Sequence, residues 1–382
     1  MGALDGVRVI ELAGIGPGPF CGMMLADQGA EVTQINRASE VGDEGGDPTR
    51  PPGNAMGRGR RSIGVDLKSS EGVETVLRLV TGADMIFEGF RPGVAERLGV
   101  GPDDCLARNP AIVYGRMTGW GQDGPYSSMA GHDINYIALA GVLAHIGRSD
   151  SGPVPPMNLV GDFGGGGMYL AYGMVCALLE ARSSGKGQIV DAAMVDGAAS
   201  LMSFIHGMLA SGFHSPERGT NMLDTGAHFY DVYECADGGW ISLGSIEPQF
   251  YAELLDKLGL DVERFAKQHD RGLWPELTEE IAAVVRMKTR DEWDVILEGS
   301  DVCYAPVLTV SEATRHPHNV ARGTFIEVGG ITQPGPAPRL SRTPGEVRRP
   351  PAHAGQHTDE ILAEAGFADD EVAALRASGA IA

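Results

Sequence analysis

The stretch Val7-Arg-Val-Ile-Glu-Leu12, continued by Gly14-Ile-Gly16-Pro-Gly18-Pro19, decides the fold class of this chain. The first part is an apolar run of strand length, and the second is a glycine- and proline-rich turn that leads into a helical segment at 20–27. Further strand-like runs, with a helical segment at 71–80 between two of them, follow at 31–35, 62–65, 83–88 and 111–116. Strands that alternate with helices predict a doubly wound, Rossmann-like α/β sheet.

A second domain is expected because 382 residues exceed what one hydrophobic core usually serves. Residues 214–227 are rich in Gly, Asn, Ser and Pro, which is typical of a linker. Beyond them, a hairpin is predicted to turn at Asp237-Gly238-Gly239, and helical segments follow at 249–258, 274–285 and 290–298. This part of the chain is therefore predicted to form a smaller α+β domain.

Composition argues against several classes of function. Lys and Arg total 30 against 51 Asp and Glu, and the formal net charge of −21 makes nucleic acid or an anionic membrane an unsuitable main partner. The five cysteines are scattered without a Cys-x-x-Cys pair, so we expect no metal site, no disulfide framework and a reducing compartment. The sequence shows no signal-peptide pattern and no apolar run of membrane-spanning length. We therefore expect a soluble, cytoplasmic protein.

The glycine-rich turn after the first strand resembles a dinucleotide-binding fingerprint, but imperfectly. Its sixth position is Pro19, where glycine or alanine is expected, and the second strand ends in Asn36-Arg37 without the acidic residue that holds a ribose. A close strand–helix turn is therefore the better interpretation. Arg37 at that strand end suits a phosphate.

Basic residues gather near several strand ends of this acidic chain, at Arg58-Gly-Arg60-Arg61, Lys68, Arg91 and Arg97. Such clusters are often only a solvated face. Ligands of open α/β sheets bind at strand ends, however, and arginine makes bidentate contacts to phosphate. The pattern is therefore consistent with a nucleotide-like polyanion as ligand.

Two polar clusters precede apolar helical runs at 137–146 and 168–179. They are Gly131-His132-Asp133-Ile-Asn-Tyr and Asn158-Leu-Val-Gly-Asp162-Phe. A helix start offers unpaired N–H groups and the positive end of the helix dipole. His132 and Asp162 at two such ends could flank a carbon whose deprotonation leaves an oxyanion. Taken singly, His132 could be a structural histidine, and Asp162 an N-cap, as could Glu247 before Pro248.

The chain resembles the alpha-methylacyl-CoA racemases of the family III CoA-transferase superfamily. The motifs that carry the resemblance run nearly end to end: Leu4-Asp-Gly-Val-Arg-Val-Ile-Glu-Leu-Ala-Gly-Ile-Gly-Pro-Gly-Pro, Glu88-Gly-Phe-Arg-Pro-Gly-Val, Arg116-Met-Thr-Gly-Trp-Gly-Gln, Gly131-His-Asp-Ile-Asn-Tyr, Asn158-Leu-Val-Gly-Asp-Phe-Gly-Gly-Gly, Asp191-Ala-Ala-Met-Val-Asp-Gly, Asn221-Met-Leu-Asp and Ile246-Glu-Pro-Gln-Phe-Tyr. The transferases similar to this chain usually carry an aromatic residue at the position of His132. One departure is Thr225, where these racemases usually have glycine.

The resemblance implies an isomerase that interconverts (R)- and (S)-2-methylacyl-CoA thioesters by removing and returning the α-proton through an enolate. His132 and Asp162 would be the two acid/base residues on opposite faces of the α-carbon, and Glu247 would pair with His132. The N–H of Asp133 would donate to the thioester oxygen, an oxyanion-hole arrangement. No metal, flavin or nicotinamide would be needed, because coenzyme A is part of the substrate.

The resemblance also implies a coenzyme A site and an assembly. The expected coenzyme A contacts are Arg37, Val65, Asp66, Leu67, Lys68, Gly89, Phe90, Arg91, Arg97, Gly131, Ile134, Asn135 and Tyr136. The expected assembly is an interlocked homodimer in which Glu247 reaches the site of the partner subunit. Its large domain would comprise residues 1–195 and 325–382, with a linker at 196–229 and a small domain at 230–324.

Two alternatives stay open beside the racemase. The first is a family III CoA transferase in which Asp162 attacks the thioester as a nucleophile and forms an anhydride. The second is a catalytically silent acyl-CoA-binding protein, against which the combination of His132, Asp162 and Glu247 argues. The acyl tail could lie on pliable methionines, although these residues could equally be ordinary core: Met117, Met157, Met168, Met194 and Met202.

Overall fold

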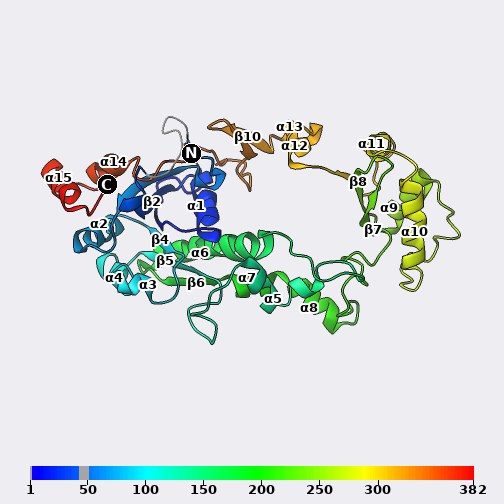
Figure 1. The fold of residues 1–382 in the computed structure, drawn as a ribbon, viewed down its shortest axis with the longest axis horizontal. Coiled ribbons are helices and arrows are strands. Elements are labelled where there is room, and N and C mark those ends of the chain that lie inside the picture. The colour runs from blue at the N-terminus through cyan, green and yellow to red at the C-terminus, as the bar shows by residue number, and fades with distance from the viewer. Residues whose placement is uncertain (1, 43–50) are drawn as a thin grey trace. The chain divides into compact units, whose positions relative to one another are not determined.

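The computed structural model describes residues 2–42 and 51–382 of the chain (Figure 1). The chain forms two compact units. The first comprises Met1–Ala140, Met157–Leu201 and Val320–Ala382, and the second comprises Gly141–Pro156 and Met202–Asn319. None of the helices in the described ranges is both long enough and apolar enough to cross a membrane.

The first unit is built on a six-stranded parallel sheet. Its strands are β1 (Arg8–Leu12), β2 (Glu31–Arg37), β3 (Arg60–Val65), β4 (Met85–Glu88), β5 (Val113–Thr118) and β6 (Ile189–Ala193). They lie in the order β3-β2-β1-β4-β5-β6. The chain proceeds from β1 outward through β2 to β3, and then crosses to β4 on the opposite flank of β1. The strand order therefore reverses between β1 and β4. The predicted doubly wound α/β fold is confirmed.

Helices pack on both faces of this sheet, as the alternation of side chains along β1 shows. Val9 points to a core that includes Leu25 of α1 and Met174 of α6, whereas Ile10 points to a core that includes Val76 of α2 and Leu362 of α14. The helices of this unit are α1 (Pro17–Asp27), α2 (Ser70–Val80), α3 (Val94–Arg97), α4 (Pro102–Arg108), α5 (Asp133–Leu139), α6 (Met168–Ser184), α7 (Met194–Leu201), α14 (Thr358–Glu364) and α15 (Asp369–Ser378), with short 3-10 turns η1 (Ala38–Glu40) and η2 (Ala55–Gly57).

Two of the basic residues predicted to face a ligand are instead buried in the scaffold. Arg58 donates to both carboxylate oxygens of Asp27, at 3.0 and 2.6 Å, and to Gln333 Oε1 at 2.8 Å. Arg60 is paired with the buried carboxylate of Glu11 on β1. The expectation that Arg58 and Arg60 serve a ligand is therefore wrong, since their donors are taken up by residues distant in the chain.

The C-terminal segment completes the outer strand of the sheet. Arg61 pairs with Glu360 and Glu364 of α14 at 3.0 and 2.7 Å. Past α15, Ala380 O accepts the Asp66 N–H at 2.9 Å, and Ile381 forms a bridge with Val65. These contacts attach the end of the chain to β3.

The second unit is an α+β domain, as predicted. Its antiparallel sheet has the order β7-β8-β9, and the β7–β8 turn at Gly238 has a φ of 77°, which glycine adopts without strain. Its elements are η3 (Leu143–His145), α8 (Ser203–Ala210), β7 (Tyr230–Glu234), β8 (Trp240–Gly244), α9 (Pro248–Leu258), α10 (Trp274–Val285), α11 (Arg290–Leu297), β9 (Tyr304–Val307) and α12 (Val310–Ala313). The return to the first unit carries α13 (Pro317–Arg322), β10 (Phe325–Val328) and β11 (Ile331–Pro334).

Two helical segments differ from the expectation. The alanine-rich run at 192–210, for which the sequence predicts a helix, begins as strand, because Ala192 and Ala193 pair with Met117 and Thr118 of β5. Only then does it continue as α7 and α8. The helix after His132 ends at Leu139 and not near 146, and Gly141 adopts a left-handed φ of 82° two residues later. In the first segment the pairing with β5 overrides the apolar periodicity, and in the second segment a glycine does so.

Thr225 carries backbone strain in the second unit. Its φ is 77°, a conformation that a β-branched residue rarely adopts.

We expect Thr225→Gly to stabilise the second unit by about 1 kcal/mol, because glycine removes the steric cost of a left-handed backbone. The free energy of unfolding in urea measures the effect. Thr225→Ala serves as the matched control, since alanine keeps a Cβ in the same conformation and should bring little of this gain. Equal stability of the glycine variant and the wild type would show that the backbone at 225 is not strained in solution.

His228 lies in the core of the second unit. It is fully buried, and its Nε2 lies 2.7 Å from the Tyr251 hydroxyl. Burial, helped by the nearby His269, lowers the pKa of His228 to about 4. The folded protein therefore holds a neutral imidazole at pH values where the unfolded chain is already protonated.

We expect the second unit to lose stability as the pH falls from about 6.5 to 4, because only the unfolded state binds the His228 proton in this window. A pKa about 2.5 units below the ordinary value corresponds to about 3 kcal/mol over the whole window. His228→Phe should lack this component, whereas the exposed His318→Gln should retain it. Denaturant unfolding at pH 7 and pH 4.5 tests this, and identical acid sensitivity of wild type and His228→Phe would contradict it.

Candidate active site

Most of the predicted site residues of the first unit end or follow strands at one edge of the parallel sheet. The strand register places Arg37 beside Val65, Leu12 beside Ile35 and Glu88 beside Arg116, so five strands end at the same edge. Ligands of such sheets bind outside the carboxyl ends of the strands, where the strand order reverses. The loops after β1, β4 and β5 therefore enclose the candidate site.

The glycine-rich turn after β1 makes room for the Asp162 carboxylate. Gly16 has a left-handed φ of 67° and stands directly before α1. A Cβ at Gly16 would lie 3.1 Å from Asp162 Oδ2. The turn that resembles a dinucleotide fingerprint thus borders a carboxylate of the same chain.

Asp162 belongs to a helix that the sequence did not predict. Leu159–Gly167 forms a π-helix that continues into α6, so Asp162 lies in its first turn and not at an N-cap before a helix. The glycines at 164–167 allow this segment to pack backbone against backbone. A Cβ on Gly165 would lie 2.6 Å from Ala198 N, and one on Gly167 would lie 2.7 Å from Pro17 O. Short π-helical segments of this kind are frequent at functional sites.

His132 stands directly before α5, as predicted. Its side chain is exposed, and its N–H donates to Asn135 Oδ1 at 3.0 Å. The start of α5 is fixed by an aromatic pair, in which the rings of Trp120 and Tyr136 lie 4.7 Å apart in a T-shaped arrangement. Gly131 is required here, because a Cβ would approach the Tyr136 ring to 2.8 Å.

One hydrogen bond joins Asp162 to the residue that follows His132. Asp133, the residue after His132, accepts the Asp162 N–H through Oδ2 at 2.7 Å, although the two residues are 29 positions apart in the chain. Asp162 Oδ2 in turn accepts a hydrogen bond from Asn158 Nδ2 at 3.0 Å. The Asp133 N–H is the first donor of α5 and meets no acceptor within residues 2–42 and 51–382. It is therefore free to bind an oxyanion.

The pKa of the Tyr136 phenol is affected by two charged residues of the predicted site. Burial raises its pKa most, the Asp162 charge raises it further, and the Arg91 guanidinium lowers it. The loop after β4, which carries Arg91, thus lies within electrostatic reach of the same phenol as Asp162. The sequence predicted that all three residues belong to one site.

Sequence reasoning gave no role to Glu88, which organises the loop after β4. Its buried carboxylate accepts the Phe90 N–H at 2.5 Å and the Arg116 Nε–H at 3.2 Å. Burial raises the pKa of Glu88 to about 7 against these two hydrogen bonds. The sequence could have indicated this role, because Glu88 is the first residue of the Glu-Gly-Phe-Arg motif.

The predicted coenzyme A contacts differ in how accessible they are. Lys68, Arg91 and Arg97 are exposed, as is Arg37, whose side chain is 80% exposed and 3.9 Å from Glu40. Gly89, Ile134 and Asn135 are also exposed, and Asp66, Leu67, Phe90 and Gly131 are half-buried. Val65 and Tyr136 are buried. Any contact of a ligand with Val65 would therefore involve its backbone.

Glu247, the third predicted catalytic residue, belongs to the second unit. It is exposed and directly precedes α9, whose first residue is Pro248. His132 and Asp162 belong to the first unit. One chain thus distributes the three residues over its two units.

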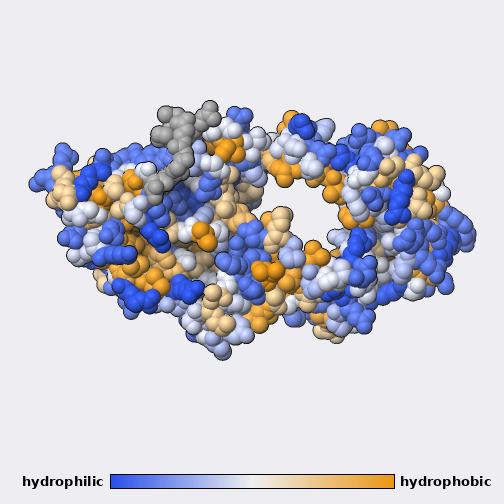
Figure 2. Space-filling model, in the orientation of Figure 1, coloured by the Kyte–Doolittle hydropathy of each residue, from blue (hydrophilic) through white to orange (hydrophobic). Residues whose placement is uncertain are grey.

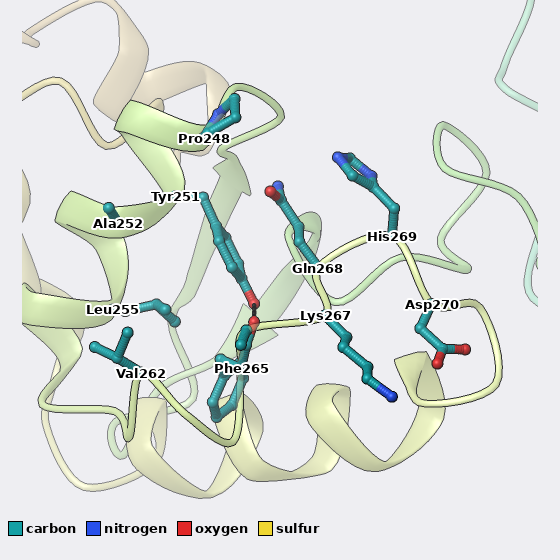
Figure 3. Close-up of a pocket in the computed structure, with 11 residues that line it drawn as sticks. Pro248, Tyr251, Ala252, Leu255, Val262, Phe265, Lys267, Gln268, His269 and Asp270 are labelled. Carbon is teal, nitrogen blue, oxygen red and sulfur yellow. Dashed lines mark hydrogen bonds between the residues drawn. The ribbon is translucent and has the colours of Figure 1, made fainter.

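A cavity of about 630 Å³ lies within the second unit near the start of α9 (Figure 3). Pro248 stands at its rim. The Tyr251 hydroxyl points toward the Phe265 backbone and donates to its carbonyl oxygen at 3.3 Å. Its lining is mainly apolar: Tyr251, Ala252, Leu255, Val262, Phe265 and Ala266, with Lys267, Gln268, His269 and Asp270 beside them. It does not contain His132 or Asp162, so the candidate active site is the carboxyl edge of the parallel sheet.

The family model of CoA-transferase family III matches residues 4–358 of the chain. The chain belongs to this family. It is 48% identical to the alpha-methylacyl-CoA racemase of Mus musculus and 44% identical to that of Homo sapiens, over 97% of this chain and 96% and 95% of those proteins. It is also 34% identical to a succinyl-CoA–D-citramalate CoA-transferase of Chloroflexus aurantiacus, over 99% of this chain and 98% of that protein.

Solved structures of family III proteins share this fold. A CAIB/BAIF family protein from Brucella suis matches with a TM-score of 0.82 and 28% identity, covering 95% of this chain and 99% of that one. The family resemblance expected from the sequence motifs is confirmed. Because the family contains transferases as well as racemases, the geometry around His132 and Asp162 has to decide between the two chemistries.

Proposed function

We propose that this family III protein is an alpha-methylacyl-CoA racemase, an isomerase that interconverts (R)- and (S)-2-methylacyl-CoA thioesters. The observation that carries the proposal is the hydrogen bond from the Asp162 N–H to Asp133, which joins Asp162 to the residue that follows His132. The 48% and 44% identity to alpha-methylacyl-CoA racemases supports it.

The mechanism follows from the acidity of a thioester α-hydrogen. One of His132 and Asp162 removes the α-proton from one enantiomer, and the electron pair moves onto the thioester oxygen to form an enolate. The Asp133 N–H donates to that oxygen and stabilises its charge. The conjugate acid on the opposite face then returns a proton to the α-carbon, which inverts the centre. The reaction needs no cofactor besides the coenzyme A that the substrate carries.

We infer that exposed cations at the carboxyl edge bind the phosphates of coenzyme A. Arg37 ends β2, Lys68 follows β3, and Arg91 and Arg97 follow β4. These cations gather at one edge of a protein whose net charge is −21, and arginine is well suited to bind phosphate. For the acyl tail, the structure distinguishes among the methionines. Met117 and Met194 are core residues, whereas Met157 and Met168 are exposed on either side of the π-helix. An acyl chain bound beside Asp162 would meet these two flexible side chains.

We also infer that the active form is an interlocked homodimer. An apolar stripe at helical spacing runs along α6, where Met168, Tyr172, Val175 and Leu179 are 50, 71, 38 and 73% exposed. Hydrophobic residues reach the surface of both units in the view of Figure 2. A contiguous apolar helix face of this kind is typical of a surface that a partner covers. The location of Glu247 in the second unit fits a site to which the partner subunit contributes.

A single-enantiomer 2-methylacyl-CoA incubated in deuterated water tests the activity. A racemase yields α-deuterium and both enantiomers. His132→Ala should lose about 10²–10⁴-fold in this rate, as is usual for an acid/base residue, while the exposed His318→Ala should not. Transfer of coenzyme A to a second carboxylic acid, with release of the free 2-methyl acid and no α-deuterium, would instead establish the transferase, with Asp162 as nucleophile. Binding with neither reaction would establish the silent acyl-CoA-binding protein.

Complementation between variants tests the shared site. Asp162→Ala and Glu247→Ala should each be inactive, yet partly regain activity when they are unfolded and refolded together. A mixed dimer would contain one site with both lesions and one site with neither. Mixing the folded dimers should not restore activity, because interlocked chains exchange slowly. If verified mixed dimers stayed inactive, all three residues would act within one chain.

A further inference from the structure

The carboxylate of Asp133 is not used by the proposed mechanism, which needs only the backbone N–H of this residue. Asp133 is nevertheless 6% exposed, an unusual place for an acidic side chain at a ligand site. Oδ2 accepts the Asp162 N–H at 2.7 Å, and Oδ1 is buried without a hydrogen-bond partner in the described part of the chain. Burying a carboxylate is costly unless it is hydrogen-bonded or paired, so the bond from the Asp162 N–H matters for its stability.

The contact joins two helix starts. The first N–H groups of any helix lack partners within that helix, and the π-helix begins three residues before Asp162. Asp133 supplies the missing acceptor from the first residue of α5. Burial raises the pKa of Asp133 most, and the nearby N–H groups of Asp162 and Gly161 lower it.

Gly161 approaches Asp133 closely at this contact. A Cβ on Gly161 would lie 2.5 Å from Asp133 Oδ2 and 3.2 Å from Asp133 Cα. The peptide that carries Asp162 is therefore pressed directly against the Asp133 side chain. A shift of this peptide displaces the Asp162 carboxylate relative to Gly16 on the other side.

His132 is held by different means. Its backbone N–H donates to Asn135 Oδ1 at 3.0 Å, and its carbonyl oxygen accepts the Asn135 N–H at 2.8 Å, both at the start of α5. None of these hydrogen bonds involves the Asp133 carboxylate. The two acid/base residues thus depend on separate supports.

We propose that the Asp133 carboxylate is a positioning residue that fixes Asp162 at the substrate, so that it controls proton transfer on the Asp162 face and not on the His132 face. This inference rests on the proposed racemase. A displacement of about 1 Å can cost about 10²-fold in rate, and that is the loss expected on one face.

The two enantiomers of 3-fluoro-2-methylpropanoyl-CoA separate the two faces. One base removes the α-proton, and the resulting electron pair forms the C2–C3 double bond while fluoride leaves with the C–F pair. The product is methacryloyl-CoA. Because this elimination needs no proton from the opposite residue, fluoride release from each enantiomer reports one base. The Asp162-face enantiomer is the one whose elimination Asp162→Asn slows more.

Asp133→Ala should slow elimination of the Asp162-face enantiomer by about 10²-fold and leave the other within about threefold. Asp133→Asn keeps an oxygen acceptor for the Asp162 N–H and should recover most of the loss. Gly161→Ala perturbs the same contact from the opposite side and should reproduce the one-sided loss. Gly207→Ala is the matched control, since a Cβ there meets nothing within 4 Å. The Michaelis constants should change little.

Equal slowing of both enantiomers by Asp133→Ala and Gly161→Ala would overturn the proposal, because it would place the defect in the shared oxyanion donor or in α5 itself. Unchanged elimination on both faces would overturn it as well. If Asp133→Ala does not fold, Gly161→Ala and Asp133→Asn decide between the same outcomes. Wild-type protein that releases fluoride from neither enantiomer, yet transfers coenzyme A to an acid, would defeat the proposed racemase and with it this role of Asp133.

Discussion

The candidate site depends on the direct contact of helix backbones at Gly165, Gly167 and Gly197. A Cβ at Gly197 would lie 1.8 Å from Gly165 O, so these backbones touch without intervening side chains. This contact holds the π-helix against α1 and α7, and thereby sets where Asp162 stands relative to the turn after β1. The hydrogen bond between Asp133 and Asp162 then joins the π-helix to α5. Close backbone packing comes first, and the placement of acid and base follows from it.

The same scaffold separates two kinds of cation that look alike in the sequence. Arg58 and Arg60 lie in buried ion pairs with Asp27 and Glu11 and stabilise the sheet from within. Removing one member of such a pair leaves an uncompensated buried charge, which costs about 3–5 kcal/mol. Arg37 ends β2 and Arg91 lies in the loop after β4, yet both remain exposed, where they are available to phosphates. Only the tertiary partners of each arginine distinguish the two groups.

Much of the fold was predictable from local sequence. Apolar runs near Val7 and Glu31 locate strands, and the hairpin turn at Gly238 occurs where the Asp-Gly-Gly motif indicates it. The π-helix was not predictable, because it depends on contacts between the 164–167 glycines and helices distant in sequence. The burial of Arg58 and Arg60 was missed for the same reason. The motifs located His132 and Asp162, but not the Asp133 carboxylate that links them.

The π-helix also has a consequence for insertions and deletions. A π-helix has more residues per turn than an α-helix. The glycines of this segment therefore set how far Asp162 is rotated about the helix axis relative to the residues of α6. Successive residues of an α-helix are rotated by about 100° around the axis. Deleting one residue from the 164–167 run would rotate everything before it, and the Asp162 carboxylate would turn away from Gly16. The length of this glycine run, and not only its composition, therefore determines whether a family III chain of this design presents its carboxylate to the ligand edge.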